Sequence, residues 1–163
     1  MSAFETIVGR YEGLVAKIII PMLGNSYDAD DVGQETFIRF YKSMKQFKGD
    51  SQLGTYLARI AINLSLNEIK KRTNHRTQST SDTMNFDIPH ANTEKSIDNT
   101  ELVNNALATL DIKFRSIIIL RHIQGFSTKE TANILELPLG TVLSRLSRGQ
   151  DKLKKIITKL EKI

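Results

Sequence analysis

Short polar and basic side chains on one predicted helix near the C-terminus have the chemistry needed to bind DNA. From Thr141 onward, apolar residues recur at a spacing of about 3.6 residues, which predicts a helix with one apolar stripe. The stripe contains Val142, Leu146 and Leu153. The same helix leaves four polar or basic side chains facing outward: Thr141, Ser144, Arg145 and Arg148. Hydroxyl and guanidinium donors near a helix N-terminus suit base edges and phosphates, so we predict a DNA-reading helix.

A second, shorter helix must position this reader. Ser127 is followed three residues later by Glu130, and this capping-box pattern predicts a helix over 128–135. Pro138 and Gly140 then predict a tight turn before the longer helix. Two helices joined by such a turn are typical of helix-turn-helix proteins, whose second helix enters the major groove. A soluble helical hairpin with a basic face is the alternative at this point.

Charge is distributed unevenly along the chain. Residues 28–35 contain four acids and no base, whereas the stretch from Arg145 to the C-terminus contains seven Lys or Arg and two acids. The net charge of +5 favours a polyanionic partner. We therefore expect nucleic acid at the basic end and a basic protein partner at the acidic segment, for which a solvated helix face is the alternative.

The composition argues against catalysis, metal binding and membrane insertion. The chain has no cysteine, and its three histidines are scattered, so we expect no disulfide, thiolate or metal site. We find no nucleophile paired with a base and no phosphate-binding glycine loop, so we expect no enzyme, no cofactor and no small-molecule substrate. No apolar run approaches the ~20 residues of a membrane span, and the first residues lack the basic start and cleavage site of a signal peptide, so we expect neither feature. We expect a soluble, intracellular protein.

Three helices are predicted in the N-terminal block. Apolar residues from Phe4 to Ile18 follow one helical face, and Pro21 is expected to kink or end that helix. A second amphipathic helix is predicted over Asp28–Phe47 and a third from about Leu53 to Arg72. Residues 48–51 are predicted to form the loop between them.

A polar segment separates this block from the C-terminal one. Ser, Thr, Asn and Gln make up 14 of the 28 residues in 73–100, and such a segment buries too little apolar surface to offset its ordering entropy. We predict an all-α fold in which two small helical domains, residues 1–72 and 101–163, are joined by a flexible linker over 73–100.

Three strings of residues resemble those of bacterial sigma factors and occur in the family's order. They are Asp28–Phe37 (Asp-Ala-Asp-Asp-Val-Gly-Gln-Glu-Thr-Phe), Arg59–Asn63 (Arg-Ile-Ala-Ile-Asn) and Gly140–Arg148 (Gly-Thr-Val-Leu-Ser-Arg-Leu-Ser-Arg). The resemblance covers nearly the whole chain. Because the chain has room for two domains only, it resembles the extracytoplasmic-function (ECF) group of the family. Four positions depart from the family's pattern, among them Tyr56 in place of the common Trp and Gln150 in place of a frequent Arg. Gly33 replaces a branched apolar residue, and Leu143 replaces a frequent Lys or Arg, so that Leu143 would contact a thymine methyl group or pack internally.

The resemblance implies a sigma2-like domain over 1–72 that binds core RNA polymerase and melts the −10 promoter element. Its acidic helix would grip a coiled coil of the largest polymerase subunit through Asp28, Asp31, Gln34, Glu35 and Arg39. The loop and third helix would contact −10 DNA through bases and phosphates. These contacts are expected from Lys48, Asp50, Ser51, Arg59, Asn63, Lys70, Lys71 and Arg72.

The resemblance also implies a sigma4-like helix-turn-helix domain over 101–163 that recognises −35 DNA. Its contacts are expected from Lys129, Thr141, Ser144, Arg145 and Arg148. The partners implied are core RNA polymerase, promoter DNA and an anti-sigma factor, with a cytoplasmic location that a membrane-bound anti-sigma factor would shift to the membrane. Two rival hypotheses are a stand-alone helix-turn-helix regulator that acts without polymerase and a nuclease, which the lack of clustered carboxylates near His or Lys disfavours.

Overall fold

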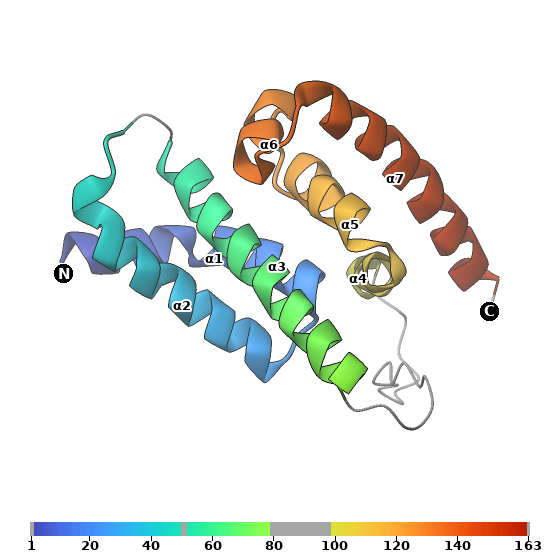
Figure 1. Ribbon diagram of the computed structural model, residues 1–163, viewed down its shortest axis with the longest axis horizontal. Coiled ribbons are helices and arrows are strands. Elements are labelled where there is room, and N and C mark those ends of the chain that lie inside the picture. The colour runs from blue at the N-terminus through green and yellow to red at the C-terminus, as the bar shows by residue number, and fades with distance from the viewer. Residues whose placement is uncertain (1, 50–51, 79–98, 163) are drawn as a thin grey trace.

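All regular structure in the described part of the chain is helical, which confirms the predicted all-α fold (Figure 1). The computed structural model describes residues 2–49, 52–78 and 99–162. The helices are α1 (Ala3–Leu23), α2 (Tyr27–Ser43), α3 (Leu53–Gln78), α4 (Asn99–Thr109), α5 (Ile112–Ile118), α6 (Thr128–Leu135) and α7 (Leu139–Glu161). A 3₁₀ turn, η1 (Met44–Gln46), follows α2, and a π-helical turn, η2 (Ile119–Ile123), follows α5. None of the described helices combines the length and apolar character of a membrane span.

Helices α1, α2 and α3 pack together around residues such as Ile18, Phe40 and Leu57, which are almost fully buried. Pro21 does not end the helix, because α1 continues through it to Leu23. Pro21 lies buried in the last turn, where its missing N–H removes only one hydrogen bond. The helix ends instead at Gly24, whose positive φ of 84° suits glycine and whose N–H donates to the Ile20 carbonyl.

The second helix is shorter, and the third is longer, than the sequence predicted. Helix α2 ends at Ser43, before the 3₁₀ turn, rather than at Phe47. Helix α3 continues through 73–78, part of the segment predicted as a linker, while residues 79–98 of that segment lie outside the described residues. The last turns of α3, residues 73–78, are helical although they lack the apolar face that the sequence prediction had looked for. Thr73 and Thr77 donate their hydroxyl protons to carbonyls of the preceding turn, at 3.0 Å from Ile69 O and 2.9 Å from Asn74 O.

The C-terminal unit places α7 across α5 at very close range. Gly149 of α7 is buried at this crossing, and a Cβ there would lie 3.1 Å from the Cβ of Phe114. The capping box of α6 forms as predicted, since the Glu130 N–H donates to Ser127 Oγ at 3.0 Å. The turn into α7 differs in detail. Glu136 adopts the left-handed conformation, and Gly140 already belongs to the first turn of α7.

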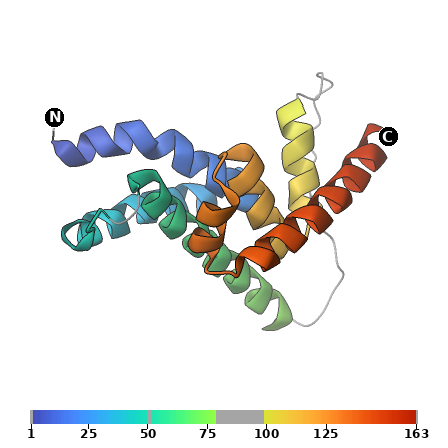
Figure 2. The same cartoon turned by 90° about the horizontal axis from the view of Figure 1, so that it is seen from above.

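The two helical units pack against each other and share one apolar core. Figures 1 and 2 show α1 beside α4, and α3 beside α6. Arg115 of α5 joins the units, because one of its nitrogens donates to the Met22 carbonyl at 2.8 Å and the other to the Ala108 and Leu110 carbonyls at 2.9 Å. Burial lowers the pKa of Arg115, and the neighbouring Asp111 carboxylate opposes this effect.

Candidate nucleic-acid and protein interfaces

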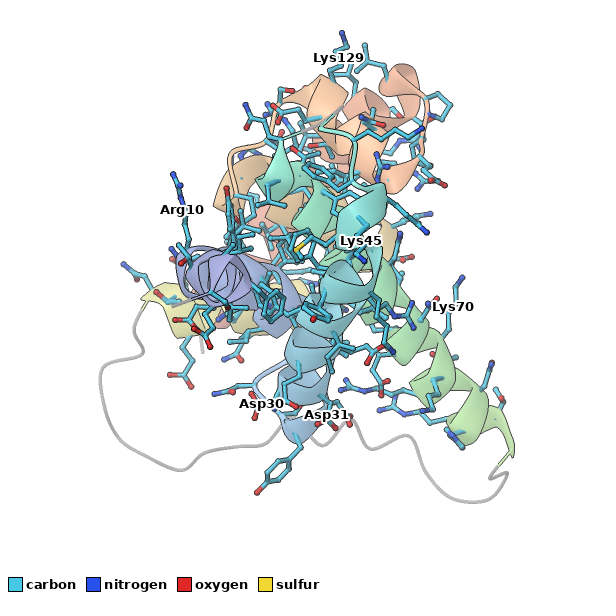
Figure 3. The ribbon with its side chains drawn as sticks, turned by 90° about the vertical axis from the view of Figure 1, so that its left-hand side faces the viewer. Arg10, Asp30, Asp31, Lys45, Lys70 and Lys129 are labelled. Atoms are coloured by element: carbon cyan, nitrogen blue, oxygen red, sulfur yellow. The ribbon has the colours of Figure 1, made fainter. Side chains whose placement is uncertain are left out.

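The predicted acidic surface lies on the outer face of α2. Ser26 caps the helix by accepting the Ala29 N–H at 3.4 Å, and acids in the first turn suit the positive end of the helix dipole. Figure 3 shows Asp30 and Asp31 at this first turn, on the opposite side of the molecule from Lys129. Asp31 and Gln34 are exposed, and Glu35 accepts a hydrogen bond from Arg39 Nε at 3.0 Å. The arrangement is an acidic helix face that is open to a partner.

Three apolar side chains on α2 are exposed, and reasoning from the acids alone had missed them. Tyr27 is 89% exposed, Ile38 45% and Tyr41 59%. Together with Asp31 and Gln34 they follow alternating steps of four and three residues, so they form one stripe along the helix. This spacing was the signal in the sequence that could have revealed them. Exposed apolar residues among charges are typical of protein interfaces.

Asp28 and Arg72, which were predicted to lie on different interfaces, contact each other. Arg72 Nη2 lies 2.9 Å from Asp28 Oδ2, and its Nη1 donates to the Leu23 carbonyl at 3.2 Å. These contacts tie α3 to the end of α1 and the start of α2. Arg72 and Lys70 are two residues apart, which corresponds to about 200° around the axis of α3. The two side chains therefore lie on different faces of the helix.

A stripe of polar and basic residues lies on another face of α3. Arg59, Asn63 and Lys70 are spaced to share this face, and Asn63, Lys70 and Lys71 are exposed. Lys48 is exposed in the preceding loop, while Asp50 and Ser51 lie outside the described residues. Figure 3 shows Lys70 projecting from the helix into solvent.

Tyr56 precedes this stripe and belongs to the packing of the N-terminal unit. Its hydroxyl donates to Ser43 Oγ at 2.9 Å. Its ring lies edge-on to Phe40, with centroids 6.1 Å apart, and against Phe47, with centroids 4.9 Å apart. Tyr56 therefore joins the first turn of α3 to the C-terminal end of α2 and to Phe47.

Arg59 contacts the helix-turn-helix unit. Its Nη2 donates to the Asn133 carbonyl at 3.1 Å and to Asn133 Oδ1 at 2.9 Å. Asn133 belongs to α6, the first helix of the helix-turn-helix pair. The N-terminal end of the α3 stripe thus faces the other unit in this arrangement.

The helix-turn-helix unit presents basic and hydroxyl groups from both helices. Lys129 projects into solvent from α6 (Figure 3). On α7, Ser144 and Arg148 are exposed, whereas Thr141 and Arg145 are half-buried. The apolar stripe faces inward as predicted, with Val142 buried and with Leu146 and Leu153 packed against the core.

Leu143 does not pack internally. It is 50% exposed, and Leu139, one turn earlier on α7, is 49% exposed. Neither side chain belongs to the apolar core. Of the two alternatives predicted for Leu143, internal packing is therefore excluded, and Leu139 is an exposed residue for which no role was predicted.

Comparison with known proteins identifies the family. The Sigma-70 region 2 family matches residues 7–75, and the Sigma-70, region 4 family matches residues 100–153. The ECF RNA polymerase sigma factor SigW of Bacillus subtilis is 30% identical, over 94% of this chain and 88% of its own length. The chain belongs to the ECF sigma factors. The ECF RNA polymerase sigma-E factor of Escherichia coli is 33% identical, over 91% of this chain and 83% of its own length.

Solved structures share the fold of this sigma factor. The sigma factor RpoE of Bartonella quintana, in complex with the anti-sigma factor NepR, superposes with a TM-score of 0.81 at 23% identity, covering 97% of this chain and 98% of that one. CnrH, in complex with the cytosolic domain of CnrY, superposes with a TM-score of 0.69 at 25% identity, covering 96% and 88%. The protein is thus a DNA-binding sigma factor that works with RNA polymerase in transcription initiation, and the stand-alone regulator is not favoured. Sigma factors as a class are not enzymes, so a non-catalytic role fits the family.

Proposed function

We propose that this sigma factor uses three separate faces: the outer face of α2 for core polymerase, the polar stripe of α3 for the −10 element, and the N-terminal half of α7 for the −35 element. The observation that carries the proposal is the α2 face, where acids and apolar side chains are exposed together. None of the three apolar residues on this face belongs to the apolar core, although the Tyr41 ring lies edge-on to Phe4 with centroids 5.0 Å apart, and their exposure supports a protein partner for them.

The polymerase contact is assigned to Asp31, Gln34, Glu35 and Arg39, with Ile38 and Tyr41 supplying apolar area. Charge complementarity with a basic coiled coil of the largest polymerase subunit would steer association, while burial of the apolar side chains would hold the complex. Asp28 adds charge at the edge of this face while it is paired with Arg72.

The −10 contact is assigned to the loop before α3 and to the α3 stripe. Extruding a base costs a few kcal/mol, which hydrogen bonds to the base and contacts to the exposed strand would offset. Asn63 is suited to the base because an amide both donates and accepts. The assigned residues are Lys48, Asp50, Ser51, Arg59, Asn63, Lys70 and Lys71, with Arg72 reaching phosphate only after leaving Asp28.

Arg59 must leave Asn133 before it contacts DNA. We therefore propose that the arrangement described here is a closed form, in which α6 covers part of the α3 stripe, and that the two units separate when polymerase and promoter bind. The two units that separate are the domains predicted from the sequence, residues 1–72 and 101–163, and the first of them extends to the end of α3 at Gln78.

The −35 contact is assigned to the helix-turn-helix pair. The N-terminus of α7 would face the major groove, where Ser144 and Arg148 are open to base edges and phosphates. Thr141 and Arg145, which are half-buried, would contact the DNA backbone beside them, and Lys129 of α6 would bind a phosphate.

RpoE is seen with an anti-sigma factor, and CnrH is seen with the cytosolic domain of CnrY. We extend this to the present chain and propose that an anti-sigma factor binds the closed form in the cytoplasm. An anti-sigma factor carried on a membrane protein would hold it at the membrane.

Binding to purified core polymerase tests the α2 assignment. Asp31→Lys reverses charge on an exposed residue of the proposed face, and we expect about tenfold or greater weakening because an attractive contact becomes repulsive. Glu161→Lys makes the same change in charge at the far end of α7 and should leave core binding unchanged. Equal affinities of both variants and wild type would refute this interface.

A further inference from the structure

Leu139 and Leu143, hereafter the leucine pair, form an apolar patch on the recognition helix that the fold does not use. The two residues lie one helical turn apart, so their side chains are neighbours. About half of each side chain is exposed, whereas Leu146 and Leu153 of the same helix pack against the core. The fold thus packs Leu146 and Leu153 partly buried against the core and leaves about half of each residue of the leucine pair exposed.

The leucine pair lies within the face proposed to bind DNA. Helical spacing places Ser147 next to Leu143, followed around the exposed arc by Ser144 and then Arg148. These neighbours are exposed, and Arg148 supplies the positive charge that DNA requires. The patch is therefore continuous with a cationic and hydroxyl-bearing surface rather than isolated from it.

We propose that Leu143 packs against the C5-methyl group of a thymine in the −35 element and that Leu139 covers the outer side of that contact. The inference rests on the proposed entry of α7 into the major groove. Thymine is the one standard base that presents an apolar group there. A leucine cannot hydrogen-bond to guanine, adenine or cytosine, and would leave their polar edges without a partner. Leu143 is thus a specificity-determining residue, and the −35 element contains a thymine opposite it.

Replacing thymine with deoxyuridine tests the proposal, because this removes only the methyl group. A −35 element is first selected from a randomised promoter library with holoenzyme formed from the full chain and core polymerase. Holoenzyme affinity is then measured with each −35 thymine replaced in turn, for wild type, Leu143→Ala and Leu143→Met. Replacing one particular thymine with deoxyuridine should weaken binding by wild-type holoenzyme about fourfold. This factor corresponds to the free energy of burying one methyl-sized group.

The leucine variants show whether that methyl group is read by Leu143. Leu143→Ala should bind thymine and deoxyuridine equally, and Leu143→Met, which keeps an apolar side chain of similar reach, should retain the preference. The inference would be overturned if wild-type affinity stayed the same when any of the −35 thymines was replaced with deoxyuridine. Loss of core binding by Leu143→Ala in the absence of DNA would also overturn it, because the pair would then be a protein contact.

Arg148→Ala separates this inference from the proposed function. Weaker promoter binding by Arg148→Ala, together with insensitivity of wild type to the methyl groups, would reject the thymine contact and keep α7 as the DNA reader. Unchanged binding by Arg148→Ala and no selection of any −35 sequence would reject the placement of α7 itself.

Discussion

The contact between Arg59 and Asn133 predicts that a single substitution on α6 will shift the molecule toward open forms. Arg59 donates to both the backbone carbonyl and the side-chain Oδ1 of Asn133. Asn133→Ala keeps the carbonyl and removes the Oδ1 contact at 2.9 Å. A hydrogen bond of this kind at an exposed site contributes about 1 kcal/mol, which corresponds to about a fivefold shift from closed toward open forms.

Two dyes, one on each unit, would measure this shift. The chain has no cysteine, so Glu12→Cys on α1 and Lys159→Cys on α7 supply unique labelling positions. We expect Asn133→Ala to increase the ratio of open to closed molecules about fivefold, and to strengthen apparent core binding by up to the same factor while the closed form dominates. Asn105→Ala, an exposed change on α4, serves as the matched control. Identical energy-transfer distributions for Asn133→Ala and wild type would refute the role of this contact.

Three further predictions concern the free energy of unfolding and are measured by urea denaturation. Gly33→Ala should stabilise the protein by about 1 kcal/mol, because alanine favours the helix and its Cβ would lie 4.0 Å from Ile19 Cδ1, an ordinary contact. Gly149→Ala should destabilise it by about 1 kcal/mol, because overpacking against Phe114 exceeds the gain in helix propensity. Arg115→Ala should destabilise it by about 2–4 kcal/mol, because three carbonyls lose a charged donor. Shifts of the same sign for Gly33→Ala and Gly149→Ala would contradict the packing described here, as would an unchanged stability for Arg115→Ala.

Local features of the helix-turn-helix unit could be predicted from the sequence because they depend on near neighbours. The cap formed by Ser127 and Glu130 needs only three residues of separation, and the burial of Val142 follows from helical periodicity. Pro21 shows where such a local signal falls short. A proline marks a lost hydrogen bond, but its position in the last turn and the glycine after it decide where the helix ends.

Contacts between distant residues could not be predicted in this way. Arg59 and Asn133 are 74 residues apart, and nothing in the local pattern of either residue indicates the other. The pairing of Asp28 with Arg72 is similar, because an acid in a cluster gives no sign of which base will reach it. The exposed Ile38 and Tyr41 were missed because only polar residues of that helix were considered for its outer face.

The central claim is that this chain directs core RNA polymerase to promoters through α2 and α7. The most direct test is transcription from a promoter library by purified core polymerase, with and without the chain, comparing wild type with the double variant Gln34→Ala/Glu35→Lys. We predict transcripts from defined start sites only when the chain is added, and fewer of them with the variant. An absence of specific transcripts on every promoter, combined with binding to a palindrome without polymerase, would contradict the account.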